Sequence, residues 1–200
     1  MAKEQMPVAN LLYSEVHSVL LARHMLLFAV GLQHLSPTKA IPGLTKHHRA
    51  IMEQLADSAI KLVNANDALL GTLEGLENLI LEGFYHIDGG NIRRAWITMR
   101  RAVMTAQLLG LHRPGHYRFK SVNQQNDLDS AVMWACVVST EQFLCLLLGL
   151  PTSTSGASFT IPRATSAFVE SGNLPVLIPD VVRKIIERNQ THASQEALDM

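Results

Sequence analysis

The sequence predicts an all-α domain, built from antiparallel helical hairpins packed as a bundle and containing no sheet. Apolar residues recur at spacings of three and four along most of the chain, which is the period of an amphipathic helix. Helix-stopping pairs such as Ser36-Pro37 and Gly89-Gly90 follow these runs. No segment keeps the period-two alternation that a half-buried strand needs.

The composition suits one domain with tails. Hydrophobic residues make up 48% of the 200 positions, which is enough to fill a core and too apolar for a disordered chain. Aromatic residues are only 6%, so aliphatic side chains must fill that core. We assign 1–13 to an N-terminal tail, 14–151 to the helical domain, and 152–200 to a mobile loop, a short helix and a frayed C-terminus.

The first two helices are expected at 14–35, with Ser14 as N-cap, and from Thr45, also an N-cap, to about residue 63. Apolar residues cover nearly the whole circumference of the first helix after Val19, as is typical of a helix at the centre of a bundle. The second helix shows one apolar face, which we expect to be Ile51, Leu55, Ala59, Leu62 and Val63.

The third and fourth helices are expected around 69–88 and 91–109, with Asn91 as the cap of the fourth. Gly110 follows the last apolar position of the fourth helix, where a left-handed residue commonly ends a helix and Leu111 folds back onto it. The predicted core positions of the third helix are Leu69, Leu73, Leu76, Ile80 and Phe84, and those of the fourth are Ile92, Ala95, Trp96, Met99, Val103, Ala106 and Leu109.

The fifth helix is expected to begin near Asp127 or Asp129 and to end at Gly149. Its tryptophan, Trp134, is predicted to be a core anchor like Trp96. Beyond Pro151, residues 152–160 are small and polar and suit a mobile loop, and a short last helix at 180–188 follows Pro179.

Charge is balanced over the chain but segregated along it. The net charge is zero, whereas a DNA-binding domain usually shows a basic excess. Residues 53–88 hold seven acids against Lys61 alone, and residues 91–120 hold seven bases and no acid. One interpretation is two adjacent helices whose complementary charges meet across a hairpin. The other is a basic patch for an acidic partner, formed by Arg93, Arg94, Arg100 and Arg101 opposite the apolar stripe of the fourth helix.

Catalytic and cofactor-binding patterns are absent from the sequence, so we expect no enzyme, no catalytic residue and no cofactor. Histidines provide three weak metal candidates. His112 and His116 are separated by Pro114-Gly115, which forbids a shared helical face, and His47-His48 point about 100° apart on a helix. His17 and His24 share a face but have no cysteine nearby, so we expect no metal site.

The two cysteines are expected to be free thiols. Cys136 and Cys145 are nine positions apart in one helix, about 13 Å along its axis. A disulfide needs Cα atoms within roughly 7 Å, so the chain suits a reducing compartment. Polar residues interrupt the apolar run at 19–35, so we expect no membrane span and no membrane partner.

A family resemblance adds to these patterns. Residues 90–96 (GNIRRAW) and 109–113 (LGLHR), followed by Met133-Trp134 and by 146–151 (LLLGLP), resemble the fungal-specific transcription factor domain, the regulatory middle region of fungal zinc-cluster transcription factors. The likeness covers residues 20–151. The chain departs from the family pattern at several charged or aromatic positions, which here are Met104, Ser130, Ala131, Val132, Ala135, Glu141, Gln142 and Leu150, and Arg100 stands where the family has a small residue.

The resemblance implies a nuclear, regulatory segment that does not contact DNA, or a shortened relative of such a regulator. The family's DNA-binding module needs six cysteines and binds zinc, and this chain has two cysteines, so zinc is expected only in a separate N-terminal module. Expected partners are other proteins or the rest of a full-length regulator, and a small-molecule effector is left open. A helical scaffold for protein interactions and a small-molecule-binding bundle remain alternatives; the first needs repeats at a fixed period, the second an apolar pocket with convergent polar groups.

Overall fold

The computed structural model describes residues 17–36, 38, 41, 43, 46–113, 119–123, 128–154, 184–186, 188 and 191. Throughout this part of the chain, all regular structure is helical and no strand occurs, so the predicted all-α class is confirmed. The helices are α1 (Ser18–Gln33), α2 (His48–Ala59), α3 (Leu73–Asp88), α4 (Ile92–Leu109) and α5 (Ser130–Leu148), with a π-helical turn η2 (Ile60–Asn64) and a 3₁₀ turn η3 (Asp67–Leu69).

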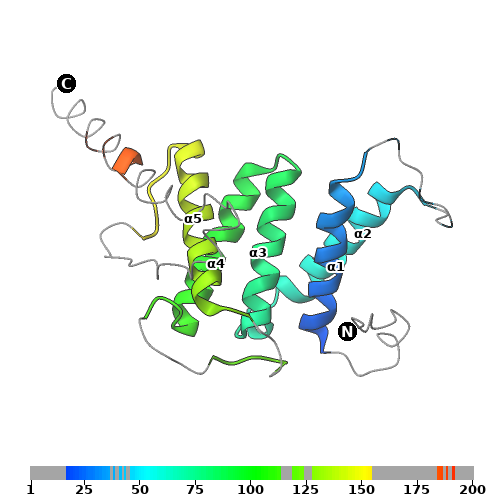
Figure 1. Ribbon diagram of the computed structural model, residues 1–200, viewed down its shortest axis with the longest axis horizontal. Helices are drawn as coiled ribbons and strands as arrows, with labels where there is room; N and C mark the ends of the chain where they lie inside the picture. Colours follow the sequence, from blue (N-terminus) through cyan, green and yellow to red (C-terminus); the bar gives the residue numbers. More distant parts are fainter. Residues whose placement is uncertain are drawn as a thin grey trace, which may run out of the picture.

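The helices pack mainly in a row, in which α1, α3 and α4 each lie between two others. Helix α3 packs against α4 and α1, α4 packs against α3 and α5, and α1 packs against α2. Figure 1 shows α3, α4 and α5 grouped together, with α1 and α2 at the other side of the molecule. The order of contact is therefore α5, α4, α3, α1 and α2.

The largest core lies between α3, α4 and α5, and the predicted apolar face of α4 is confirmed there. Ala95, Met99, Val103 and Ala106 are buried, whereas Ile92, Trp96 and Leu109 pack against the cluster while partly exposed. Trp134 is buried, as predicted. A second cluster joins α1 to the end of α2 and to η2, and it contains Val19, Ala22, Leu26, Ala59 and Val63.

Three helices end on a glycine in the left-handed conformation. Gly90, Gly110 and Gly149 have φ angles of 73°, 87° and 66°. After α4, the amide of Leu111 donates to the carbonyl of Ala106 at 3.0 Å and Leu111 is buried, which is the Schellman arrangement that the sequence predicted. Backbone hydrogen bonds at the equivalent positions follow α3 and α5.

Several predicted helix starts are wrong. The N-caps of α1 and α2 are His17 and His47, whose Nδ1 atoms accept backbone N–H groups at 3.3 Å; Ser14 and Thr45, the predicted caps, lie outside the described residues. Asn91 occupies the cap position of α4, but its side chain makes no cap hydrogen bond. Helix α3 begins at Leu73 rather than near 69, because the 3₁₀ turn and the Thr72 cap precede it. The cap of α5 is Asp129, one of the two predicted residues.

The predicted buried face of the second helix is also wrong at its end. Leu62 is 74% exposed, whereas Asn64 is fully buried. The wider turn η2 is the physical reason, because a π-helical turn takes more residues than an α-helical one and shifts the register that follows. A prediction that assumes about 3.6 residues per turn throughout therefore places Leu62 in the core by mistake.

The C-terminal expectations are only partly visible. Residues 184–186 are helical, and Ile186 packs beside Cys145 at the end of α5. The predicted start of this helix after Pro179 and the tail at 1–13 lie outside the described residues. At the start of the segment predicted to be a mobile loop, Thr152 and Thr154 are buried, and Thr154 accepts a hydrogen bond from Gln142 of α5.

Helix α5 is long and apolar enough to cross a membrane by length and composition, a feature that the sequence reading overlooked by considering only 19–35. A core helix of a water-soluble domain meets the same criterion. The fully buried side chain of Glu141 and the buried Gln142 lie on its inner side, where they contact protein groups. These contacts favour a core helix over a membrane span.

We expect Asp129→Ala to destabilise the protein by about 1 kcal/mol, because Asp129 Oδ1 accepts the amides of Ala131 at 2.8 Å and Val132 at 3.2 Å. Asp129→Asn keeps a capping oxygen and should lower the free energy of unfolding by less. Urea unfolding followed by circular dichroism measures both. Equal losses for the two variants would contradict a capping role.

Candidate functional site

The four arginines of α4 were predicted to share one partner-binding side, and the structure divides them. The Nε atom of Arg100 lies 3.0 Å from Oε1 of Glu141, a fully buried carboxylate on α5. Its guanidinium also stacks over the Trp96 ring, 4.9 Å from the ring centroid, and donates to the carbonyl of Pro151. Arg100 is therefore committed to holding α4, α5 and the residues after α5 together.

Arg101 is committed in the opposite direction. It donates to the backbone carbonyl of Asn64 at 2.8 Å and to Oδ1 of Asp67 at 2.9 Å. These groups belong to the end of η2 and the start of η3, so Arg101 fixes the chain that leads into α3. The prediction of one four-arginine face is wrong for this residue as well.

Arg93 and Arg94 remain exposed in the first turn of α4, and neither makes a hydrogen bond or an ion pair in the described part of the chain. No acid lies in that turn, and Asn91 leaves the first amides without a side-chain cap. Positive charge is unfavourable at the positive end of a helix macrodipole. Two arginines therefore sit where the local structure does not favour them.

Apolar side chains continue the exposed surface toward the C-terminus of α4. Ile97, Met104 and Leu108 are 55%, 53% and 82% exposed. With 100° of rotation per residue, Arg93 and these three side chains fall within about 60° of one another around the helix. We call this surface the outer face of α4 and define it as Arg93, Arg94, Ile97, Met104 and Leu108.

A buried polar cluster joins η2, α3 and α4. Glu82 accepts hydrogen bonds from Asn64 Nδ2 at 2.7 Å and from Thr98 Oγ1 at 3.1 Å, and His86 Nε2 lies 3.8 Å away. Burial acts to raise the pKa of Glu82, but hydrogen bonds from His86, Asn64 and Thr98 outweigh it and lower the pKa. The ionised carboxylate thus has its partners within the protein, which indicates a structural role.

Asn78 connects the same region to α1. The side-chain Nδ2 of Asn78 donates to the backbone carbonyl of Val19 at 2.9 Å. The backbone carbonyl of Asn78 accepts from Nδ2 of Asn64 at 3.2 Å. Four elements are thereby tied through side chains that the sequence analysis did not single out. Their signal was a set of polar residues on the inner side of the third helix, at positions 74, 78 and 82.

Glu141 organises the far end of the molecule. Besides its ion pair with Arg100, Glu141 accepts hydrogen bonds from the amide and the hydroxyl of Ser153, at 3.0 and 3.1 Å. Cys145 lies beside it, and Trp96 Nε1 donates to the cysteine sulfur at 3.3 Å. Burial is the largest cause that raises the pKa of Cys145, to about 11, so this thiol is a packing residue. Trp96, predicted to be a core anchor, is partly buried: it packs against the core and bridges α4 and α5.

A third buried carboxylate, Glu74, anchors the loop before α5. It accepts from Ser121 Oγ at 2.5 Å, from the amide of Val122 at 2.9 Å and from the amide of Asn123 at 3.0 Å. Burial acts to raise the pKa of Glu74, but these hydrogen bonds outweigh it and lower the pKa to about 2. Residues 120–123 are thereby fixed against the start of α3.

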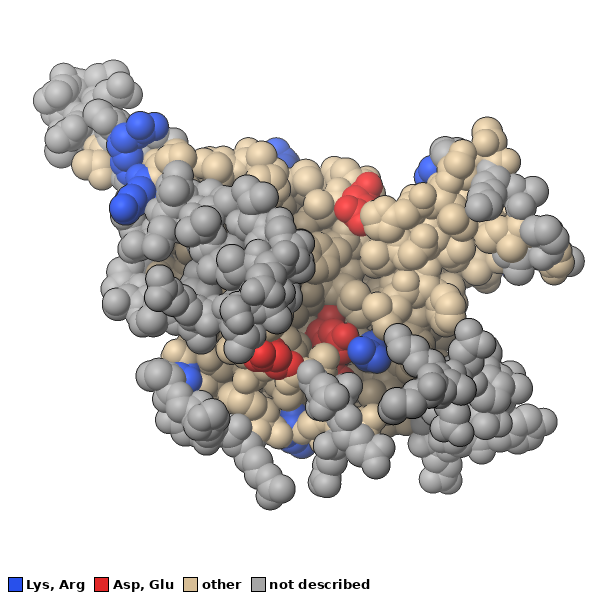
Figure 2. Space-filling view, in the orientation of Figure 1, with Lys and Arg blue, Asp and Glu red and all other residues tan. Residues whose placement is uncertain are grey.

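The acidic and basic stretches meet less than the sequence predicts in the described part of the chain, which does not include Arg118 of the basic stretch. Asp67–Arg101 is the single ion pair that joins them among the described residues. The other pairs of the acidic stretch lie within it or reach α1: Arg23–Glu77 at 2.6 Å, His34–Asp88 at 3.6 Å, Asp57–Lys61 at 2.8 Å and His86–Glu82 at 3.8 Å. On the face shown in Figure 2, charged side chains appear in small separate groups on a mostly uncharged surface.

The histidines and cysteines do not assemble a metal site in the described part of the chain, where no three His, Cys, Asp or Glu side chains come together. His17 and His47 act as helix caps, His24 Nδ1 lies 2.7 Å from the carbonyl of Leu20, and His112 lies beside the Trp134 ring. The rings of His47 and His48 are neighbours, with centroids 4.3 Å apart. His116 lies outside the described residues.

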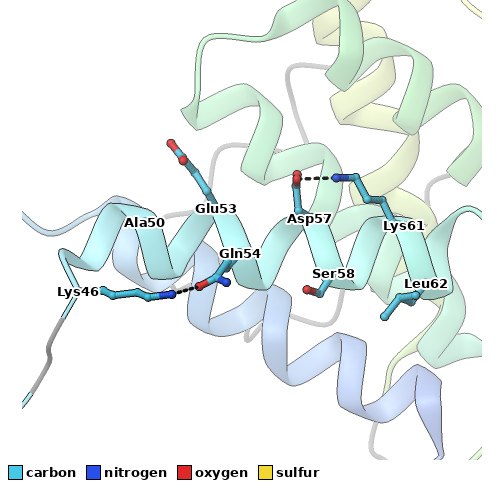
Figure 3. A pocket seen from close by; sticks show the side chains of 8 residues that line it. All are labelled: Lys46, Ala50, Glu53, Gln54, Asp57, Ser58, Lys61 and Leu62. Carbon is cyan, nitrogen blue, oxygen red and sulfur yellow. Dashed lines mark hydrogen bonds and ion pairs between the residues drawn. The ribbon is translucent and has the colours of Figure 1, made fainter.

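The exposed side of α2 carries an open groove of about 620 Å³. Figure 3 shows that its polar side chains pair along the helix, Asp57 with Lys61 and Lys46 with Gln54. Side chains of α2, its π turn and the residue Lys46 before them line it: Lys46, Ala50, Glu53, Gln54, Asp57, Ser58, Lys61 and Leu62. It lacks the enclosure and the convergent polar groups that a small-molecule site needs.

Comparison with known proteins relates the chain to fungal regulators. It is 91% identical over all 200 residues to "Probable transcription factor gsfR1" of Penicillium aethiopicum, of which it spans 29%. It is 39% identical over 183 residues to the "Dehydrocurvularin biosynthesis regulator" of Aspergillus terreus, covering 89% of this chain and 25% of that protein. It is 37% identical over 180 residues to "Transcription factor eupR" of a Phoma species, covering 88% and 39%.

These relatives are named as transcription factors or regulators rather than as enzymes, and the chain spans well under half the length of each. They support the resemblance to fungal transcription factors that the sequence showed. No family model matches the chain. No solved structure matches it either.

We expect Arg100→Gln to lower the free energy of unfolding by about 2–4 kcal/mol, because it leaves the buried Glu141 without its cation. Arg93→Gln is the matched control on the same helix and should change stability by less than about 0.5 kcal/mol. Chemical denaturation compares them. Indistinguishable values would show that the Arg100–Glu141 pair does not hold α4 to α5.

We expect Glu74→Gln to destabilise the protein near pH 7 and to matter less in acid. Because hydrogen bonds lower the pKa of folded Glu74 to about 2, from an ordinary value of 4.5, its contribution is present above pH 4.5 and is lost as pH falls toward 2. The stability difference between wild type and variant should therefore shrink across that range. Urea unfolding at several pH values measures it, and a difference that stays constant with pH would contradict the assignment.

Proposed function

We propose that this chain is a regulatory segment of a longer fungal transcription factor that acts in the nucleus and does not itself contact DNA. The observation that carries the proposal is the similarity of the whole chain to one part of proteins named as transcription factors. One relative is named as a regulator of a biosynthesis, so control of a set of biosynthetic genes is the proposed task.

The geometry supports a segment without a DNA-reading surface of its own. The chain has zero net charge, and two arginines of its most basic helix, Arg100 and Arg101, are used in contacts within the fold. Nonspecific DNA affinity depends on neutralising many phosphates, and Arg93 and Arg94 alone supply little of that. The proposed zinc-dependent DNA-binding module belongs to another part of the polypeptide.

A scaffold for protein interactions is the second candidate, and the outer face of α4 favours it over a small-molecule function. This face combines exposed cations with exposed apolar side chains, as protein-binding surfaces do. The groove on α2 is open and is lined by a single helical segment. The two candidates are compatible, since a regulatory segment works through contacts with other polypeptides.

The chain fused to a heterologous DNA-binding domain and a strong activation domain should change reporter output, whereas the chain alone should show no sequence-selective shift of duplex DNA at physiological salt. A matched fusion carrying an unrelated helical domain of similar size controls for bulk. Reporter assays and gel shifts measure the two outcomes. Unchanged reporter output would contradict the regulatory proposal. A sequence-selective gel shift would contradict the claim that the segment does not itself contact DNA.

A further inference from the structure

The outer face of α4 has the features of a docking surface for one kind of partner. Exposed apolar residues also occur on α1, at Leu21 and Phe28, and on α5, at Phe143 and Leu147. Those surfaces carry no exposed pair of like charges that specifies a partner. On α4 the apolar stripe of Ile97, Met104 and Leu108 begins beside Arg93 and Arg94. Charge therefore distinguishes this face from the others.

We propose that the outer face of α4 docks an acidic amphipathic helix carried elsewhere in the longer polypeptide. The proposal rests on the proposed function, because it takes the chain to be one segment of a larger regulator. In the 91% identical relative, the region that this chain does not span is 71% of the length, that is 100% minus 29%. Enough polypeptide therefore lies outside the chain to supply such a helix.

The electrostatic argument comes from the first turn of α4. Two cations lie at the positive end of the helix dipole, no acid offsets them in that turn, and the Asn91 side chain caps none of the free amides. A carboxylate placed there would pair with Arg93 or Arg94 and would also face the amides. Lys61 is the main cause that lowers the pKa of Asp57 on α2, and Arg94 adds only a small electrostatic effect from a distance. The site thus favours an anion without having a local one that contacts it.

The apolar stripe sets the length and orientation of the occupant. From Arg93 to Leu108 the helix rises about 22 Å, at 1.5 Å per residue. A partner helix of roughly 15 residues covers this distance. Its acidic residues would lie at the end beside Arg93 and Arg94, and its apolar residues, spaced by three and four, would cover Ile97, Met104 and Leu108.

Binding of synthetic helical peptides to the chain tests the proposal. The probe is an amphipathic peptide of about 18 residues with leucines at helical spacing and glutamates at one end, and the matched control peptide has lysines in place of the glutamates. We expect the acidic peptide to bind and the basic one to bind at least roughly tenfold more weakly, with the preference reduced by salt. Equal binding of the two peptides overturns the proposal.

Variants of the chain locate the binding surface. Arg93→Glu combined with Arg94→Glu should weaken binding of the acidic peptide by roughly tenfold and strengthen binding of the basic one. A damaged fold would not exchange the two preferences in this way. Leu108→Ser should weaken both peptides. Arg49→Glu, at the second position of α2 as Arg93 is of α4, and Leu62→Ser, another exposed leucine, are matched controls that should leave binding unchanged. Control variants that weaken binding as much as the α4 variants overturn the assignment.

Other occupants of the outer face of α4 would give different experimental results. A chain that forms dimers in light scattering, and becomes monomeric with Leu108→Ser, would show that a second copy covers this face and would overturn the proposal. Sedimentation with vesicles of phosphatidylcholine and phosphatidylserine that depends on Arg93 and Arg94 would assign it to an anionic membrane instead. Reporter output that responds to the fused chain while no peptide binds would overturn the docking surface alone and leave the proposed function standing.

Discussion

Three buried carboxylates set the architecture of this helical array. Burying a carboxyl group is costly unless protein groups replace the water it has lost. Glu74 finds them in residues 121–123, Glu82 in Asn64 and Thr98, and Glu141 in Arg100 and Ser153. Each carboxylate thus holds its helix to a segment that is distant in sequence. The loops and helix ends of the fold are positioned by this requirement as much as by apolar packing.

The same requirement decides which arginines of α4 stay available. Glu141 pairs with Arg100, and the backbone carbonyl of the buried Asn64, at the end of the π-helical turn, accepts from Arg101. Arg93 and Arg94 lie too early in the helix to reach either group and stay exposed. A single helix therefore has an inner set of arginines that stabilises the fold and an outer pair that does not. Charge pattern alone makes these two sets look equivalent, because they repeat at a spacing of seven.

Much of the fold could be predicted from the sequence, and the failures share a cause. The apolar period found α3, α4 and α5 and the glycine stops after them, because those features are local. The π turn at 60–64 was missed because it depends on burying Asn64 against Glu82, a contact between residues 18 apart. The histidine caps were missed for a similar reason, since imidazole is an uncommon cap and better capping residues stood nearby in the sequence. The candidate site was predicted only as a cluster of arginines, since partners of Arg100 and Arg101 come from other elements.

The exposed apolar side chains on α1 and α5 differ in charge setting from those on the outer face of α4. Both helices are apolar on nearly all sides, which is typical of helices covered on every face, yet Phe28 and Leu147 are exposed here. The chain spans between about a quarter and two fifths of the length of the relatives compared with it. Apolar faces without charge suit contacts that form once and stay formed, whereas a face that adds two cations to apolar residues suits a contact that depends on a particular partner and on salt. This difference in charge is why the proposed docking surface is assigned to α4 rather than to the exposed apolar side chains of α1 or α5.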